Sequence, residues 1–131
     1  MQSELATGAG PVVMLVEDFQ DTRDMMRRML ELQGCRVVEA SNGQEAIELS
    51  QRGGLDLVLM DLNMPVLDGW EATRRIRARR ETSHIPVVAI SAQCGGDWRD
   101  RALAAGASEC VQKPLDFATF DRLLDRYPTL H

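Results

Sequence analysis

Polar side chains that could do chemistry stand directly after four short apolar runs of the chain. Glu17 and Asp18 follow the first run, Asp61 ends the third, Ser91 the fourth and Lys113 the fifth. A carboxylate after a strand is by itself more often a helix cap than a catalytic group. Four run ends that all carry a charge or a hydroxyl are difficult to explain as caps. We therefore treat these residues as a candidate site.

The three carboxylates would crowd one pocket if the first and third runs were neighbouring strands. Two like charges ~4 Å apart repel by about 4 kcal/mol at an effective dielectric constant near 20. Three such groups would raise one another's pKa values or capture a cation. Carboxylates, a backbone carbonyl and waters suit Mg²⁺, which usually completes its octahedron with substrate phosphate. Asp61 could then only ligate the metal, or attack phosphorus while the metal and Lys113 neutralise the phosphoryl oxygens.

Lys113 is the only lysine, because the other 14 of the 15 basic residues are arginine. A compact ammonium on a flexible stem fits where a planar guanidinium does not. We therefore favour a functional role for Lys113 over chance survival in an arginine-biased chain. Pro114 follows it at a tight strand-to-helix junction, which makes this bond a candidate cis peptide.

The composition limits the class of protein. A chain of 131 residues, 44% hydrophobic and 27% charged, predicts one globular domain rather than a disordered chain. No apolar run approaches the ~20 residues of a membrane helix, and a net charge of −5 argues against nucleic-acid binding. Three scattered cysteines, Cys35, Cys94 and Cys110, suggest a reducing compartment, so we expect a cytoplasmic protein. Residues 1–10 are interpreted as a flexible leader.

The apolar runs alternate along the chain with segments of helical spacing. The expected strands cover residues 11–16, 35–40, 57–60, 86–90 and 109–112, and the expected helices cover 22–33, a segment from 42 onward, 67–79, 97–105 and 116–127. This alternation predicts an α/β fold, a doubly wound five-stranded parallel sheet with helices on both faces. Ligands of such sheets bind at the carboxyl ends of the strands, where the candidate residues lie.

Some helix faces can also be assigned from spacing. Asn42, with Glu45 three residues later, indicates a capped helix start. Met25 and Phe117 are expected to lie on the buried faces of their helices, toward the protein core. The arginine-rich run at residues 74–80 is interpreted as a solvated helix face rather than a nucleic-acid site.

Taken in order, these motifs closely resemble the receiver domain of two-component response regulators, the CheY-like domains. The matching segments are 16–18, 59–69, 89–92, 104–107 and 113–114, and the resemblance covers roughly residues 11–127. It implies a flavodoxin-like (βα)5 fold with strand order 2-1-3-4-5. It also implies a stand-alone receiver over residues 11–131 with no output domain.

The resemblance assigns a magnesium site. It implies that Asp18 and Asp61 ligate Mg²⁺ directly, that Glu17 holds a coordinated water, and that the backbone carbonyl of Asn63 is a further ligand.

The resemblance also assigns the phosphoryl chemistry. Asp61 would accept a phosphoryl group from a histidine kinase or a histidine phosphotransfer protein, while Ser91 and Lys113 would contact the phosphoryl oxygens. The domain would catalyse only its own phosphorylation and dephosphorylation, and would act on a downstream protein target. No nucleic acid or membrane partner is implied, and the protein would be a monomer or weak dimer.

Two positions depart from the family's usual pattern, and the first is the acidic pair, which is Glu17-Asp18 where Asp-Asp is the commoner form. Receivers usually carry Tyr or Phe where this chain has Cys110, and we interpret Cys110 as a small core residue rather than a redox centre. The departure at Cys110 leaves open a phosphorylation-independent receiver that acts as a protein-binding module. A Mg²⁺-dependent aspartyl-phosphate phosphatase is a second alternative, but Asn63 stands where such enzymes place a second acid.

Overall fold

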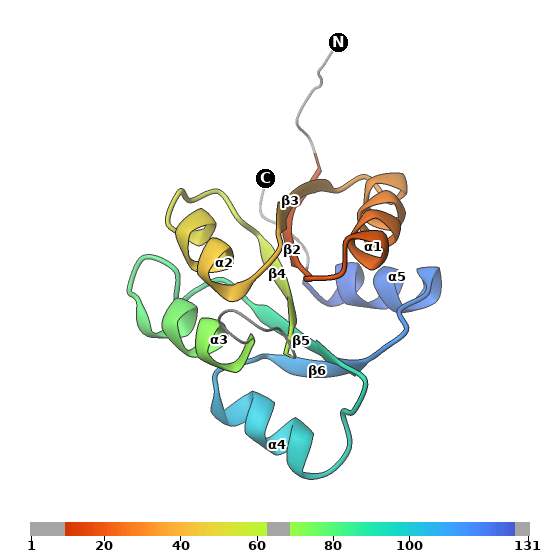
Figure 1. Cartoon of the computed structure of the whole chain (residues 1–131). Helices are drawn as coiled ribbons and strands as arrows, with labels where there is room; N and C mark the ends of the chain where they lie inside the picture. The colour runs from red at the N-terminus through yellow and green to blue at the C-terminus, as the bar shows by residue number, and fades with distance from the viewer. Residues whose placement is uncertain (1–9, 63–68, 128–131) are drawn as a thin grey trace.

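The computed structural model describes residues 10–62 and 69–127. Its centre is a parallel five-stranded sheet in the order β3-β2-β4-β5-β6 (Figure 1). In chain order this is 2-1-3-4-5, which confirms the expected topology. The strands are β2 (Val12–Val16), β3 (Arg36–Ala40), β4 (Leu57–Asp61), β5 (Val87–Ser91) and β6 (Glu109–Gln112).

Five helices cover the two faces of the sheet. They are α1 (Gln20–Leu32), α2 (Gly43–Ser50), α3 (Gly69–Ala78), α4 (Asp97–Ala104) and α5 (Phe117–Arg126). Figure 1 shows α1 and α5 together on one side of the sheet and α2 and α3 on the other. Apolar residues of α4 pack with Trp70 of α3 and Ala89 of β5. The doubly wound arrangement is therefore confirmed.

The central strands explain the two-sided core. Alternate residues of a strand point to opposite faces of the sheet. In β2, Val13 and Leu15 join the cluster beneath α1 and α5, whereas Met14 and Val16 join the cluster beneath α2 and α3. Each such buried side chain stabilises the fold by roughly 1.5–3 kcal/mol. A strand buried on both faces has to be an uninterrupted apolar run, as this one is.

Local signals set the helix starts. The side chain of Asn42 accepts a 2.9 Å hydrogen bond from the backbone N–H of Glu45, as predicted for α2. Asp116 caps α5 in the same way through the N–H of Thr119. Helix α1 begins two residues earlier than expected, because the carbonyl of Phe19 already accepts from the N–H of Arg23.

Two core predictions are wrong. Met25 and Phe117 are 51% and 47% exposed. Adjacent helical residues are rotated by about 100°, so Met25 and Met26 cannot both face the sheet, and Met26 is the buried one. Phe117 begins α5, whose inner face is formed by Phe120 and Leu123.

Some expectations fall on undescribed parts of the chain. Residues 1–9 of the expected leader and residues 67–68 of the third expected helix lie outside the described residues. In the parts that are described, no helix has the length and apolar character needed to cross a bilayer.

Candidate functional site

The predicted convergence of carboxylates is present at the carboxyl edge of the sheet. Strand β2 pairs with β4 so that Val16 lies beside Met60, which brings the following residues of both strands together. Glu17, Asp18 and Asp61 each offer a ligand oxygen, and these oxygens all lie within 4.8 Å of one another. Glu17 and Asp61 are buried and Asp18 is exposed. The cluster therefore has a solvent side through which an ion can enter.

Lys113 reaches this cluster from the end of β6. Its ammonium donates a 2.9 Å hydrogen bond to Glu17 Oε1 and a 3.3 Å hydrogen bond to Asp61 Oδ2. The peptide bond between Lys113 and Pro114 is cis, the isomer considered from the sequence. The only lysine of the chain thus contacts both buried carboxylates.

Burial and pairing act in opposite directions on these charges. Burial raises the pKa of Glu17, and the charge of Asp61 adds to that effect, while the hydrogen bond from Lys113 lowers it; the pKa stays above its usual value. Burial lowers the pKa of Lys113, but its hydrogen bond to Glu17 and the charges of both carboxylates outweigh burial and raise that pKa. Lys113 therefore carries a full positive charge at neutral pH.

Backbone and arginine contacts fix the position of Glu17. Its N–H donates to the carbonyl of Ala40 on β3, and its Oε2 accepts a 3.2 Å hydrogen bond from the N–H of Phe19. Arg23 of α1 donates a 2.8 Å hydrogen bond to the carbonyl of Glu17. Sequence reasoning missed Arg23, because one arginine among 14 carries no signal of its own.

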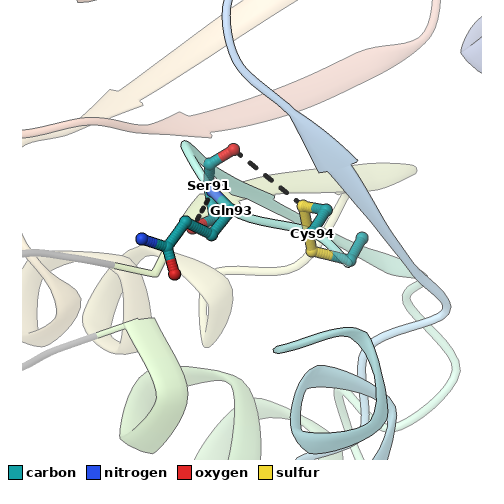
Figure 2. Close-up of a disulfide and its surroundings, with 4 residues drawn as sticks. Ser91, Gln93 and Cys94 are labelled. Atoms are coloured by element: carbon teal, nitrogen blue, oxygen red, sulfur yellow. Dashed lines mark hydrogen bonds between the residues drawn. A yellow bond between two sulfur atoms is a disulfide. The ribbon is translucent and has the colours of Figure 1, made fainter. Parts of the chain in front are cut away.

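Ser91 ends β5 beside the end of β4. The register places Asp61 opposite Ile90, so Ser91 stands one residue beyond the pair. The hydroxyl oxygen of Ser91 accepts a 3.1 Å hydrogen bond from the N–H of Gln93, and Ser91 is 1% exposed (Figure 2). Its carbonyl accepts a 2.8 Å hydrogen bond from the N–H of Lys113. A backbone hydrogen bond therefore joins Ser91 directly to Lys113.

Gly69 allows α3 to begin close to the site. A Cβ at this position would lie 2.0 Å from the carbonyl oxygen of Asp61 and 2.7 Å from the Cα of Leu62. Both neighbours are backbone atoms, so neither can yield to a side chain. The glycine of the sequence motif is thus required by the approach of the helix to the strand that ends in Asp61.

The remaining predicted ligand is not covered. Asn63, whose backbone carbonyl was expected to bind the metal, lies outside the described residues.

The cysteines require a correction. The scattered cysteines were expected to lie in a reducing compartment and Cys110 to be a small core residue, but the structure joins Cys94 to Cys110 in a disulfide with a Cα–Cα distance of 5.7 Å. That distance is in the usual range for disulfides. The spacing of 16 residues gives no sequence signal, because only the pairing of β5 with β6 brings the two positions together. Cys35 is free and buried.

The fold and the site together define a class: a doubly wound α/β domain with an acidic cluster and a lysine at the carboxyl edge of its sheet. Residues 13–125 match the response regulator receiver domain family. The chain belongs to that family, whose members are signalling domains of two-component systems rather than classical enzymes.

Individual relatives agree with this assignment. The chain is similar to the polar-differentiation response regulator DivK of Brucella anthropi, with 30% identity over 115 residues, 88% of this chain and 94% of DivK. It resembles the receiver domain of the sensor histidine kinase PA1611 from Pseudomonas aeruginosa, solved with magnesium in its active site cleft, with a TM-score of 0.84 and 35% identity over 91% of this chain and 98% of that one. It also resembles a chain in the complex of the Saccharomyces cerevisiae histidine phosphotransfer protein Ypd1 with the receiver domain of Ssk1, with a TM-score of 0.82 and 27% identity over 90% and 88%.

Proposed function

We propose that Asp61 accepts a phosphoryl group from a phosphohistidine and that the resulting change of surface is the signal. The observation that carries this proposal is the position of Lys113, whose ammonium contacts Asp61 and Glu17 inside an acidic cluster. A partly buried ammonium beside a buried carboxylate offers a nucleophile together with a counter-charge for the incoming phosphoryl oxygens.

The donor set of the site fits Mg²⁺. Three carboxylate oxygens within 4.8 Å of one another, one of them on an exposed residue, suit a hard cation that keeps several waters. In the proposed arrangement Asp18 and Asp61 hold the ion directly, Glu17 holds it through water, and the carbonyl of Asn63 supplies a further ligand. When bound, Mg²⁺ neutralises charge on the phosphoryl oxygens. The magnesium in the cleft of the PA1611 receiver supports this choice of ion.

The transfer step conserves atoms and charge. A carboxylate oxygen of Asp61 attacks the phosphorus of the donor phosphohistidine, and a new oxygen–phosphorus bond forms. The phosphorus–nitrogen bond breaks, and its electron pair stays on the imidazole nitrogen of the donor. Lys113 and the hydroxyl of Ser91 donate hydrogen bonds to the phosphoryl oxygens. Dephosphorylation uses the same site: water attacks the phosphorus, the bond between phosphorus and the Asp61 oxygen breaks, and inorganic phosphate is released.

The new charge is expected to change the neighbouring surface. An acyl phosphate on Asp61 adds negative charge beside Ser91 and Lys113, and both residues lead into segments at the surface. A local charge change of this kind biases an element that has two arrangements. The downstream protein target would recognise one of the two. We place this signalling in the cytoplasm, where kinase domains have access to their nucleotide.

The outer face of α1 is the proposed contact for the phosphodonor protein. Met25, Met29 and Leu32 lie four and three residues apart and line one surface depression, which we call the α1 patch. Met25 also borders a second depression that contains Lys113 and Pro114. An apolar surface that reaches from α1 to the site suits a donor that must place its phosphohistidine against Asp61. The complex of Ypd1 with the Ssk1 receiver supports a histidine phosphotransfer protein as this occupant.

Intact-mass analysis tests the proposal. The protein is incubated with Mg²⁺ and acetyl phosphate, a small acyl-phosphate donor, and its mass is measured at intervals. The wild type is expected to gain one phosphoryl group, Asp61→Asn none, and the matched control Asp21→Asn, an exposed α1 acid outside the cluster, one group. Gain by Asp61→Asn would disprove the assignment of Asp61. No gain by the wild type with any donor would favour the phosphorylation-independent binding module.

A further inference from the structure

We propose that Cys94 and Cys110 are a reversible redox pair whose oxidation holds the segment after Ser91 against β6 and slows phosphorylation of Asp61. The inference rests on the proposed function for its second half. Its first half, a reversible bond that restrains this segment, is independent of phosphorylation.

The positions of the two cysteines connect them to the site. Cys94 lies three residues after Ser91, and Cys110 lies three residues before Lys113. The disulfide therefore links the two segments that carry the proposed phosphoryl-binding groups. Figure 2 shows the bridge beside Ser91, where the sulfur of Cys94 lies 3.9 Å from the carbonyl oxygen of Ser91. Any displacement of one segment against the other has to be accommodated by this bridge.

Little else holds the segment between Ser91 and α4. Ala92, Gln93, Gly95 and Gly96 are all exposed. Gly96 has a φ of +51°, a backbone conformation that favours glycine, and a Cβ on Gly95 would meet no atom within 4 Å. Without the bridge, the described contacts of this segment reduce mainly to local hydrogen bonds, such as that from Gln93 to Ser91. The oxidation state of the pair thus decides how firmly the segment is held.

The pair is placed for exchange with a small thiol or disulfide. Cys94 and Cys110 are both half-buried, whereas the third cysteine, Cys35, is buried in the separate cluster beneath α1 and α5. In the cytoplasm proposed above, disulfides are generally transient and serve catalysis or redox sensing. A bond at this position is therefore expected to respond to the cellular thiol balance.

Oxidation by a small disulfide such as oxidised glutathione is balanced. The thiolate of one cysteine attacks a glutathione sulfur, forms a mixed disulfide and releases one glutathione thiolate. The second cysteine then attacks the protein sulfur of the mixed disulfide and expels a second glutathione thiolate. The two protein thiols lose two protons and two electrons, and the oxidant becomes two molecules of reduced glutathione. Excess reduced glutathione reverses both steps.

The first experiment counts thiols. Wild-type protein is equilibrated in glutathione buffers of graded redox ratio, denatured, alkylated and weighed by intact-mass analysis. We expect one alkylated cysteine in oxidising buffer, corresponding to Cys35, and three in reducing buffer. In Cys94→Ser and Cys110→Ala the remaining member of the pair is expected to form at most a mixed disulfide, seen as one added glutathionyl mass, and never an internal disulfide, whereas Cys35→Ala is expected to keep the redox response. Three alkylated cysteines in every buffer, or one in every buffer, would overturn the reversible pair.

The second experiment measures the consequence on the wild type itself, so that it does not depend on a variant that folds. Hydrogen–deuterium exchange of residues 92–96 is expected to be several-fold faster in reduced than in oxidised protein, and phosphorylation by acetyl phosphate in Mg²⁺ several-fold faster as well. Equal exchange in the two states would overturn the restraint. Different exchange with equal phosphorylation rates would overturn the regulation alone, and the proposed function would stand. No phosphoryl gain in either state would contradict the proposed function and its regulation, while exchange would still decide the restraint.

Discussion

The ammonium of Lys113 and the carboxylate of Glu17 lie 2.9 Å apart although 96 residues separate them in the chain. Two strands, β4 and β5, stand between the strands from which they come. The long lysine side chain therefore spans the carboxyl edge of the sheet and passes Asp61 on the way. One side chain ties the first and last strands of the chain to the carboxylate proposed to react, which makes the site sensitive to its loss.

Replacement of Lys113 is expected to destabilise the protein at neutral pH. Lys113→Met leaves Glu17 and Asp61, both 3% exposed, without the ammonium, and loss of a hydrogen-bonded partner of buried charge costs about 1–3 kcal/mol. Because burial raises the pKa of Glu17 and Lys113 opposes this, the pKa rises further in the variant. A folded-state pKa raised in this way favours the folded protein at low pH. The deficit in the free energy of unfolding should therefore shrink as the pH falls through the raised pKa.

Urea unfolding at several pH values measures that deficit. Arg126→Met is the matched control, because Arg126 is 56% exposed and pairs with Glu109 at 3.4 Å, and surface pairs contribute about 0–1 kcal/mol. The double variant Lys113→Met with Glu17→Gln should lose less free energy of unfolding than the sum of the losses of the two single variants. A strictly additive double variant would show that the contact between Lys113 and Glu17 contributes nothing.

Magnesium is expected to raise the melting temperature of the wild type. The cluster brings three carboxylates together with one ammonium, so a bound cation relieves the remaining repulsion. Binding to the folded state alone stabilises it, and a gain of about 1 kcal/mol raises the melting temperature by roughly 4 °C in a domain of this size. Asp18→Asn should abolish most of the rise, whereas Asp21→Asn should retain it. A thermal shift of Asp18→Asn equal to that of the wild type would place the ion elsewhere.

The α1 patch is expected to affect transfer from a protein donor but not from a small one. Met25→Ala removes an apolar contact of the α1 patch without adding a charge beside Lys113, and loss of a central interface residue costs about 1.4 kcal/mol or tenfold in affinity. Transfer from a phosphorylated histidine phosphotransfer protein that serves the wild type should slow by about that factor. Phosphorylation by acetyl phosphate should stay unchanged. Leu103→Gln, at a 40% exposed residue of α4, is the control, and an equal loss there would show that the effect is not specific to the α1 patch.

The sheet could be predicted from the sequence because its three inner strands, β2, β4 and β5, are buried on both faces. Such strands have to be unbroken apolar runs, and β4 and β5 have no residue that is not buried. The alternation with helices then fixed the parallel doubly wound arrangement. The errors at Met25 and Phe117 arose because a helical spacing of apolar residues shows that a buried face exists but not which residues occupy it.

The site was predictable to the extent that it follows from strand ends. Glu17, Asp18, Asp61 and Lys113 converge because parallel strands deliver their last residues to one edge. The contact of Arg23 with the carbonyl of Glu17 and the bond between Cys94 and Cys110 depend on how a helix and a loop pack against that edge. No spacing in the chain records that packing, so these features required the structure.

A hydrogen bond fixes the start of β6, at the opposite end of the strand from Lys113. The hydroxyl of Tyr127, just after α5, donates a 2.5 Å hydrogen bond to Glu109, the first residue of β6. Burial, this hydrogen bond and the charge of Glu109 raise the pKa of Tyr127 from 10.0 to about 12. The contact anchors the strand that carries Cys110 and leads to Lys113.

A rise in pH is therefore expected to lower the free energy of unfolding before Tyr127 ionises in the folded protein. Between pH 10.0 and about 12 the unfolded chain loses the phenolic proton while the folded protein keeps it, so the free energy of unfolding falls as the pH rises through this window. Tyr127 is the only tyrosine, so the tyrosinate absorbance band reports this group alone. Its midpoint should lie near 12 in the folded wild type, and lower in Glu109→Gln, which keeps an acceptor but removes the charge. Tyr127→Phe should remove this contribution to the pH dependence. A midpoint at the value of free tyrosine in the folded wild type would show that the anchor between Tyr127 and Glu109 does not form.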